Sequence, residues 1–270
     1  MELKVIKRVN PEIHPSAIVD PTAVLHKNVI VGPYAVIGPN CEIGEGSIID
    51  AHAVIAAHTR MGKNNHIFPH AVIGAEPQDL KFQGEFSTVV IGDFNSIREY
   101  CTIHRATGEN QETRIGSYNM FQAYVHIAHN CNLGDHIVIS SFSGLAGHVT
   151  IEDRAVIGGM SGIHQFVKIG AGSMVGGVSK IVQDVCPFVI VDGNPARVIG
   201  LNSVGLARNH ITAEVKKELK RAFKLIFRSG LKLDDAIHEM EQELSSTPEI
   251  EHLLAFLRNS DRGLCRTRER

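Results

Sequence analysis

The segment VGPYAVIGPNCEIGEGSII, residues 31–49, has a large aliphatic residue at every sixth position. Val31, Ile37, Ile43 and Ile49 each open a group of six residues. An α-helix shows apolar spacing near 3.6 residues and a half-buried strand shows spacing near 2, so neither alone produces this period. A short strand followed by a corner does produce it. The period therefore predicts a parallel β-helix, in which stacked coils share backbone hydrogen bonds.

The same period extends over most of the chain. Large apolar residues open the groups from Ile13 to Ile73, from Ile91 to Ile103 and from Ile115 to Ile181. The fifth residue of a group is usually small, which suits a narrow interior. Three cysteines occupy this fifth position, namely Cys41, Cys101 and Cys131. Packing therefore accounts for them without redox chemistry.

Two segments interrupt the period, and the last part of the chain lacks it. Residues 79–90 and 109–114 are expected to form loops on one face of the β-helix. Apolar residues from Val215 to Ile226 have helical spacing, and further helices are expected at 234–244 and from Pro248 to about Arg258. We expect residues 1–196 to form the β-helix and residues 197–270 to form a helical C-terminal domain that caps it.

The composition excludes several classes of partner. Lys and Arg number 27 against 29 Asp and Glu, so the formal net charge is only −2 and no general affinity for nucleic acid is indicated. No segment approaches the roughly 20 apolar residues of a membrane span, and no leader is evident, so we expect no integral membrane association and a cytoplasmic protein. The five cysteines show no metal-binding spacing, which fits a reducing compartment.

Histidines gather around one part of the repeat. His126 and His129 flank the core residue Ile127 in the segment AYVHIAHNC. If three groups of six form one coil, Gly147 lies one coil beyond His129. We expect groups from consecutive coils to stack on one wall of the β-helix. They belong to His126, His129, Gly147, His148, His164 and Gln165. Scattered histidines such as His14, His26, His52 and His58 are expected on solvated corners instead.

Several motifs resemble those of the UDP-N-acetylglucosamine O-acyltransferases of lipid A synthesis, within the hexapeptide-repeat acyltransferases. The motifs are QDLK (78–81), TIHRAT (102–107), HIAHN (126–130), LAGHV (145–149), GGMSGIHQF (158–166), GNPA (193–196) and FRSG (227–230). The resemblance covers nearly the whole chain. It implies a left-handed β-helix, three groups of six per coil, and a homotrimer with sites between subunits.

The resemblance also implies a reaction. A (R)-3-hydroxyacyl chain would pass from acyl carrier protein to the 3-hydroxyl of UDP-N-acetylglucosamine, without a cofactor or metal. His129 would be the general base, a task that suits imidazole because its pKa lies near neutrality. The backbone N–H of Gly147 would support the thioester oxyanion. Substrate contacts would come from Gln78, Asp79, Lys81, His126, His148, His164, Gln165, Gly177, Asn202 and Arg208.

Three of these implied contacts have more specific roles in the resemblance. Gly177 would lie at the far end of the acyl groove, where the absence of a side chain admits a longer chain. Asn202 and Arg208 would contact the nucleotide. Basic residues near the tail would receive the acidic carrier protein, for instance Arg208, Lys216, Lys217, Lys220 and Arg221.

The match has departures. Asn130 follows the proposed base where many relatives have aspartate, so the group that orients His129 is left open. Val204 and Asn209 replace polar or basic residues near the expected nucleotide contacts. The sequence also does not separate a 3-hydroxyl acceptor from a 3-amino acceptor.

Other functions could use some of the same residues. A zinc-dependent carbonic anhydrase could use His126, His129, His148 and His164 as ligands, but their spacing differs from that family's and QDLK would have no role. A non-catalytic scaffold would leave the clustered histidines unexplained. A nucleotide-sugar N-acyltransferase normally carries an extra N-terminal domain, whereas here the repeat starts at Ile13. A small-molecule acetyltransferase is a further alternative.

Overall fold

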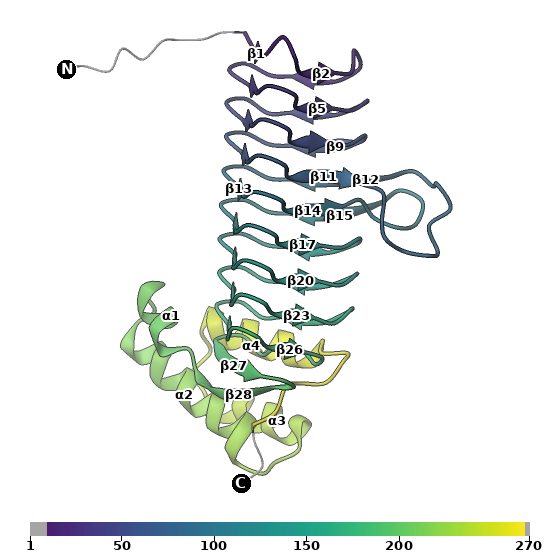
Figure 1. The fold of residues 1–270 in the computed structure, drawn as a ribbon. Helices are drawn as coiled ribbons and strands as arrows, with labels where there is room; N and C mark the ends of the chain where they lie inside the picture. The colour runs from purple at the N-terminus through teal and green to yellow at the C-terminus, as the bar shows by residue number, and fades with distance from the viewer. Residues whose placement is uncertain (1–9, 268–270) are drawn as a thin grey trace, which may run out of the picture.

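The computed structural model describes residues 10–267, so the two ends of the expected domains, 1–9 and 268–270, lie outside the described residues. Short strands follow the chain around a three-sided prism, and Figure 1 shows their coils stacked into a tall column with helices at one end. The fold is a left-handed parallel β-helix with a small α-helical C-terminal domain. Among the described residues no helix is long and apolar enough to cross a membrane.

Three sheets form the walls of the prism. Sheet A contains β1 (Glu12–Ile13), β4 (Ile30–Val31), β7 (Ile48–Ile49), β10 (His66–Ile67), β13 (Ser96–Ile97), β16 (Met120–Phe121), β19 (Val138–Ile139), β22 (Val156–Ile157), β25 (Met174–Val175), β27 (Val189–Gly193) and β28 (Ala196–Leu201). Sheet B contains β2 (Ile18–Val19), β5 (Val36–Ile37), β8 (Val54–Ile55), β11 (Val72–Ala75), β14 (Thr102–His104), β17 (His126–Ile127), β20 (Gly144–Leu145), β23 (Gly162–Ile163) and β26 (Lys180–Ile181). Sheet C contains β3 (Val24–Leu25), β6 (Glu42–Ile43), β9 (Thr59–Met61), β12 (Ser87–Ile91), β15 (Gln111–Ile115), β18 (Asn132–Leu133), β21 (Thr150–Ile151) and β24 (Lys168–Ile169).

The register confirms three groups of six per coil. Val31 pairs with Ile49, and Ile127 pairs with Leu145, eighteen residues further along the chain. The second residue of each short strand points inward, and the aliphatic residues that open the groups are almost all fully buried. Burying each such side chain contributes roughly 1.5–3 kcal/mol, so stacked layers build one continuous core. Cys41, Cys101 and Cys131 are buried in the fifth position, as expected.

Both interruptions of the repeat lie at the corner between sheets B and C, but each begins and ends earlier in the chain than the sequence predicted. The first loop spans 76–86 and the second spans 105–110. Residues 87–90 and 111–114, expected in loops, belong to β12 and β15 instead. These two strands pair over five residues, from Ser87↔Gln111 to Ile91↔Ile115, because the paired edges give their backbone groups hydrogen-bond partners.

The last coil ends in a hairpin that the sequence did not predict. β27 and β28 pair antiparallel on either side of the turn at residues 193–196, so residues 197–201 are strand and not helix. Four helices follow: α1 (Ser203–Arg208), α2 (Ala213–Arg228), α3 (Leu233–Glu243) and α4 (Pro248–Arg258). The last three agree with the predicted helices. Threonines at 212 and 247 cap α2 and α4 by accepting a backbone N–H in the first turn.

The helices cover the open end of the prism. Leu219 and Phe223 of α2 and Leu253 of α4 are buried in the same core as the hairpin residues Val189 and Val198. The free end of the core is therefore shielded from water, which matches the predicted capping role.

Corner residues form external stacks. Tyr34, at a φ of 59°, begins a column in which each ring lies about 5 Å from the next, one per coil. The column contains Tyr34, His52, His70, Tyr100, Tyr124 and Phe142. His52 is exposed at a corner, as expected, but it belongs to this stack. His14 and His26 are exposed too, whereas His58 is half-buried against Phe86.

Candidate active site

The clustered histidines line a cavity of about 530 Å³ beside the corner between sheets B and C. Its lining includes His126 from β17, His129 from the corner after β17, and Gly147 one coil later. Outward-facing Gly144 and Gly162 on sheet B leave room, because a side chain added at either would meet no atom within 4 Å. Of the residues predicted to stack on one wall, His126, His129, Gly147 and His164 line this cavity together, while their roles stay predictions.

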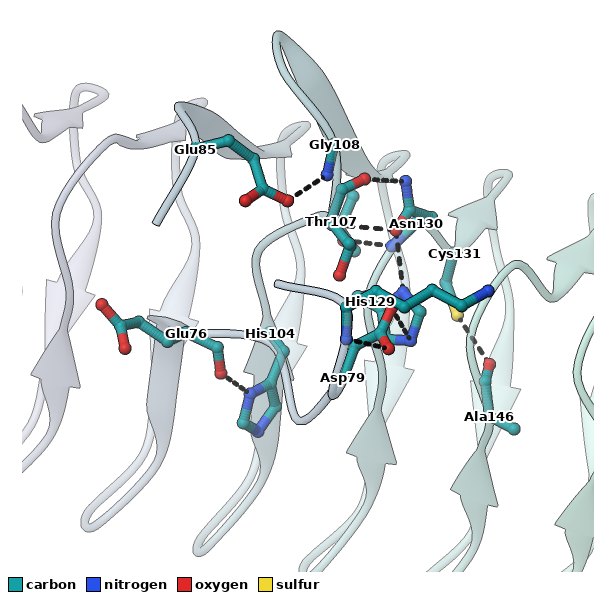
Figure 2. Close-up of polar contacts among 12 residues, drawn as sticks. Glu76, Asp79, Glu85, His104, Thr107, Gly108, His129, Asn130, Cys131 and Ala146 are labelled. Atoms are coloured by element: carbon teal, nitrogen blue, oxygen red, sulfur yellow. Dashed lines mark hydrogen bonds and ion pairs between the residues drawn. The ribbon is translucent and has the colours of Figure 1, made fainter. Parts of the chain in front are cut away.

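His129 lies between an amide and a carboxylate, as Figure 2 shows. Its Nδ1 is 2.8 Å from Oδ1 of Asn130, and its Nε2 is 3.8 Å from Oδ2 of Asp79. The Asn130 amide is itself held by Thr107, whose backbone N–H donates to Oδ1 at 2.9 Å and whose carbonyl accepts from Nδ2 at 3.0 Å. This pairing fixes which amide atom faces the ring. Because Oδ1 only accepts, Nδ1 carries the proton and Nε2 keeps a free lone pair.

Glycine is required at position 147 by the His129 ring. A Cβ atom there would lie 2.5 Å from Cε1 and 2.6 Å from Nε2 of His129. A backbone hydrogen bond joins the two coils at this corner, in which the N–H of His148 donates to the carbonyl of His129 at 3.0 Å. No acceptor among residues 10–267 is hydrogen-bonded to the N–H of Gly147. That donor therefore remains available beside the ring.

The neighbouring histidines are kept neutral by their surroundings. Burial lowers the pKa of His126, and the charges of His104 and His129 lower it further. Burial also lowers the pKa of His148, whose ring stands perpendicular to that of His129 with 5.3 Å between centroids. Neutral imidazoles can still donate and accept hydrogen bonds, so they can orient a ligand without adding positive charge next to His129.

Three residues of the site were not identified from the sequence. Thr102 lies 2.8 Å from Nδ1 of His126 through its hydroxyl, and His104 lies edge-on to His126 at 5.3 Å. Thr107 holds Asn130 as described above. All three belong to the TIHRAT motif, but the second loop lengthens their coil, so Ile103 pairs with Ile127 instead of a residue eighteen positions away. A search at a fixed spacing of eighteen misses them.

The remaining predicted residues fall in several places. Gln78 and His164 line the cavity, whereas Lys81 and Gln165 are exposed near it. Gly177 lies at the corner between sheets A and B and does not line the cavity. Asn202 is only 6% exposed and plays a structural part, because it caps α1 and donates to the carbonyl of Gly172.

Arg208 lies in a second, separate cavity. It is exposed on α1 and lines a space of about 310 Å³ beside sheet A, together with His136 and Arg154. The expected nucleotide contacts are thus on a different side of the prism from His129 within one chain. Among the described residues, no three His, Cys, Asp or Glu side chains are placed to hold a metal ion.

Comparisons with known proteins agree with this arrangement. The family model "Udp N-acetylglucosamine O-acyltransferase; Domain 2" matches residues 184–265, and "Bacterial transferase hexapeptide (six repeats)" matches residues 10–44. The acyl-[acyl-carrier-protein]–UDP-N-acetylglucosamine O-acyltransferase of Thermodesulfovibrio yellowstonii is 47% identical over 94% of this chain and 99% of its own. The enzyme of the same name from Rippkaea orientalis is 56% identical over 70% of this chain and 68% of its own.

A solved structure resembles the whole described fold. The UDP-N-acetylglucosamine O-acyltransferase (LpxA) from Moraxella catarrhalis aligns with a TM-score of 0.91 and 43% identity, over 94% of this chain and 99% of that one. Identity at this level over nearly full length covers both the coils that hold the histidines and the helical cap. This chain therefore belongs to the family of acyl-[acyl-carrier-protein]–UDP-N-acetylglucosamine O-acyltransferases.

Proposed function

We propose that the chain transfers a (R)-3-hydroxyacyl group from acyl carrier protein to the 3-hydroxyl of UDP-N-acetylglucosamine, the first step of lipid A synthesis. Family membership supports the two substrates. The mechanism rests on the surroundings of His129, which lines the cavity, has its tautomer fixed through Asn130 and keeps a free lone pair on Nε2.

The reaction follows from this geometry. Nε2 of His129 takes the proton of the sugar hydroxyl while the hydroxyl oxygen attacks the thioester carbonyl. The free N–H of Gly147 stabilises the oxyanion of the tetrahedral intermediate. The carbon–sulfur bond then breaks, and the protonated ring returns its proton to the departing thiolate of the carrier protein. Positioned general-base catalysis of this kind is worth roughly 10²–10⁴-fold in rate.

The test uses purified protein with UDP-N-acetylglucosamine and a panel of 3-hydroxyacyl carrier proteins, with products identified by mass. We expect an ester at the 3-hydroxyl, and His129→Ala should abolish turnover while leaving the fold intact. A product formed only with the 3-amino analogue, or only from a short acetyl donor, would redirect the assignment. An Ala variant that keeps more than a small fraction of the rate would remove His129 from the mechanism.

We place this reaction in a homotrimer with shared sites. The outer face of sheet C is largely polar, with Glu42, Arg60 and Asn132 exposed, whereas in the first coils the outward residues of sheets A and B are Ile and Val. The aromatic column lies at the corner where A and B meet. If three prisms join at that corner, sheet A of one chain faces sheet B of the next.

This assembly would complete the site. The sheet B–C corner of one chain, which holds His129, would then approach the sheet C–A corner of its neighbour, which holds Arg208, His136 and Arg154. Leu80, fully exposed in the first loop, would gain a partner there. Within one chain the expected acyl and nucleotide contacts are far apart. The proposed assembly would bring them together in one site between two chains.

The carrier protein would approach from the helical domain. Along α2 the exposed basic side chains Lys217, Lys220, Lys224 and Arg228 follow one helical stripe. Of the other basic residues predicted on α2, Lys216 and Arg221 are half-buried and Arg221 pairs with Glu218. An acidic carrier protein suits the exposed stripe, and its association should weaken as salt rises. Acyl carrier protein and the five free cysteines fit a cytoplasmic protein.

A further inference from the structure

Asn130 leaves the Nδ1 side of His129 without a charge. The amide sets the orientation and tautomer of the ring through its 2.8 Å bond, and the backbone of Thr107 holds the amide in turn. When Nε2 takes a proton, however, the ring becomes a cation. A neutral amide cannot offset that charge in a partly buried site, where an uncompensated cation is costly. The counter-charge has to come from another group.

Asp79 brings a carboxylate to the other side of the ring. Its Oδ2 lies 3.8 Å from Nε2, and the side chains of Asp79 and His129 are only 19% and 15% exposed. At 3.8 Å the two atoms are too far apart for a hydrogen bond, so the lone pair of Nε2 stays available to a hydroxyl. The same distance is well within the range at which a negative charge favours the protonated ring.

The first loop presents this carboxylate in a defined position. Oδ1 of Asp79 accepts the backbone N–H of Lys81 at 3.0 Å, and the Asp79 carbonyl accepts the N–H of Phe82. Glu85 ties the loop to the second loop through the N–H of Gly108 at 2.7 Å. The N–H of Lys81 is the main cause that lowers the pKa of Asp79, so the carboxylate is ionised at neutral pH. No other carboxylate among residues 10–267 forms an ion pair with His129.

We propose that Asp79 is the counter-ion of His129, stabilising the imidazolium from the Nε2 side because Asn130 cannot do so from the Nδ1 side. Asp79 is then a positioning residue, whose negative charge acts on the reaction by stabilising the protonated His129 ring. The inference rests on the proposed role of His129 as the base. It assigns Asp79 a contribution to the chemical step that is distinct from sugar binding.

The first test compares Asp79→Asn with the matched control Glu76→Gln. Glu76 lies in the same loop, but its carboxylate is 73% exposed and pairs with Arg105. Removing the negative charge of Asp79 disfavours the protonated ring, so the acidic limb of the kcat/KM profile should move about one unit to lower pH. The base is weaker as well, so kcat should fall by about tenfold. Glu76→Gln should match the wild type in both.

A sugar-binding role alone gives a different result. In that case Asp79→Asn raises KM and leaves the acidic limb where it is, which overturns the proposal. The titration of the His129 ring, followed by NMR without substrate, should show the same displacement to lower pH in Asp79→Asn. A ring that titrates as in the wild type also overturns the proposal.

Rescue by a second carboxylate completes the experiment. Adding Asn130→Asp to Asp79→Asn places a charge on the Nδ1 side, so the acidic limb should return towards higher pH and part of the lost kcat should return. A double variant no better than Asp79→Asn, though folded, contradicts the proposal. Failure of the underlying mechanism is separately visible, because an active His129→Ala variant would remove the base itself.

Discussion

At the scale of single residues, the site depends on close approach between consecutive coils. Gly147 and His129 belong to neighbouring coils, and the ring occupies the space that any side chain at 147 would need. The Asn130 amide sets the tautomer only because the second loop brings Thr107 against it. We therefore expect a small change at these residues to lower the catalytic rate without unfolding the protein.

Gly147→Ala should therefore inactivate the protein without unfolding it. The added Cβ would displace the His129 ring from its position, and misplacement of a base by about 1 Å can cost on the order of 10²-fold in rate. Gly200→Ala is the control, because a Cβ on Gly200 meets nothing within 4 Å. Steady-state kinetics measures the activity of both variants, and thermal unfolding shows whether each is still folded. A Gly147→Ala protein with wild-type kcat would show that the ring does not need this space.

Gly177→Met should shorten the preferred acyl chain. Gly177 does not adopt a positive φ, which removes the alternative that glycine is required there for backbone reasons. Its Cβ would approach the Gly159 carbonyl no closer than 3.4 Å, so a side chain can be added. Each methylene excluded from the groove costs about 0.8 kcal/mol, enough to reorder the donors.

The measurement is kcat/KM over a series of 3-hydroxyacyl carrier proteins of different length. Because Gly177 lies at the A–B corner and not in the His129 cavity, the effect requires a neighbouring chain or an acyl group that reaches this corner. If the folded variant ranks the donors as the wild type does, Gly177 does not measure chain length.

At the scale of elements, the helical domain is attached to the prism by a few polar contacts as well as by its apolar core. Asp184, fully buried, accepts the N–H of Lys168 and the hydroxyl of Ser260, which joins the last coil to the segment after α4. His252 of α4 lies 2.8 Å from Glu152 at the corner after β21. The hydrogen bond to Glu152 raises the pKa of His252, against the opposing effect of burial.

This contact should make stability depend on pH. A histidine whose pKa is raised on folding binds its proton more tightly in the folded state, so the contribution is full below the unfolded pKa of about 6.5 and is lost as pH rises through the folded pKa. The pair is partly exposed, so we expect less than about 1 kcal/mol. Urea unfolding at pH 6 and pH 8 should show this difference, and His252→Gln should remove it. If the stability of His252→Gln changes with pH as much as that of the wild type, the pH dependence comes from other groups.

At the scale of the whole molecule, the three walls of the prism differ in character. Sheet C is largely polar outside, whereas the first coils of sheets A and B present Ile and Val, and these two sheets meet at the aromatic column. A long exposed apolar strip usually marks a surface that another molecule covers. The proposed trimer buries this strip and brings the two separate cavities together.

A charge on the column should therefore abolish both assembly and activity. Tyr100→Glu introduces a carboxylate at the centre of the proposed interface, where it would be desolvated without a partner. Val24→Glu is the control, because Val24 is similarly exposed but lies on the outer face of sheet C. Sedimentation should show a trimer for the wild type and the control, and a monomer without turnover for Tyr100→Glu. An active monomer would contradict the shared site.

The repeat made the fold predictable from the sequence alone. Each coil contacts only its neighbours, so a local period of six residues specifies the burial of Ile37, Ile43 and Ile49 and of every later layer. The same regularity predicted that His129, Gly147 and His148 stack. Apolar residues at helical spacing, in the part of the chain without the period, predicted three of the four helices. The resemblance of the motifs then indicated the family.

Tertiary structure decided whatever depends on departures from that period. The bounds of the two loops, the pairing of β12 with β15 and the hairpin after the last coil come from contacts between distant segments. So do the clamp of Thr107 on Asn130 and the approach of Asp79 to Nε2 of His129. Their side chains meet because two insertions leave the same corner of the prism, and a period read along one chain has no information about the distance between two loops.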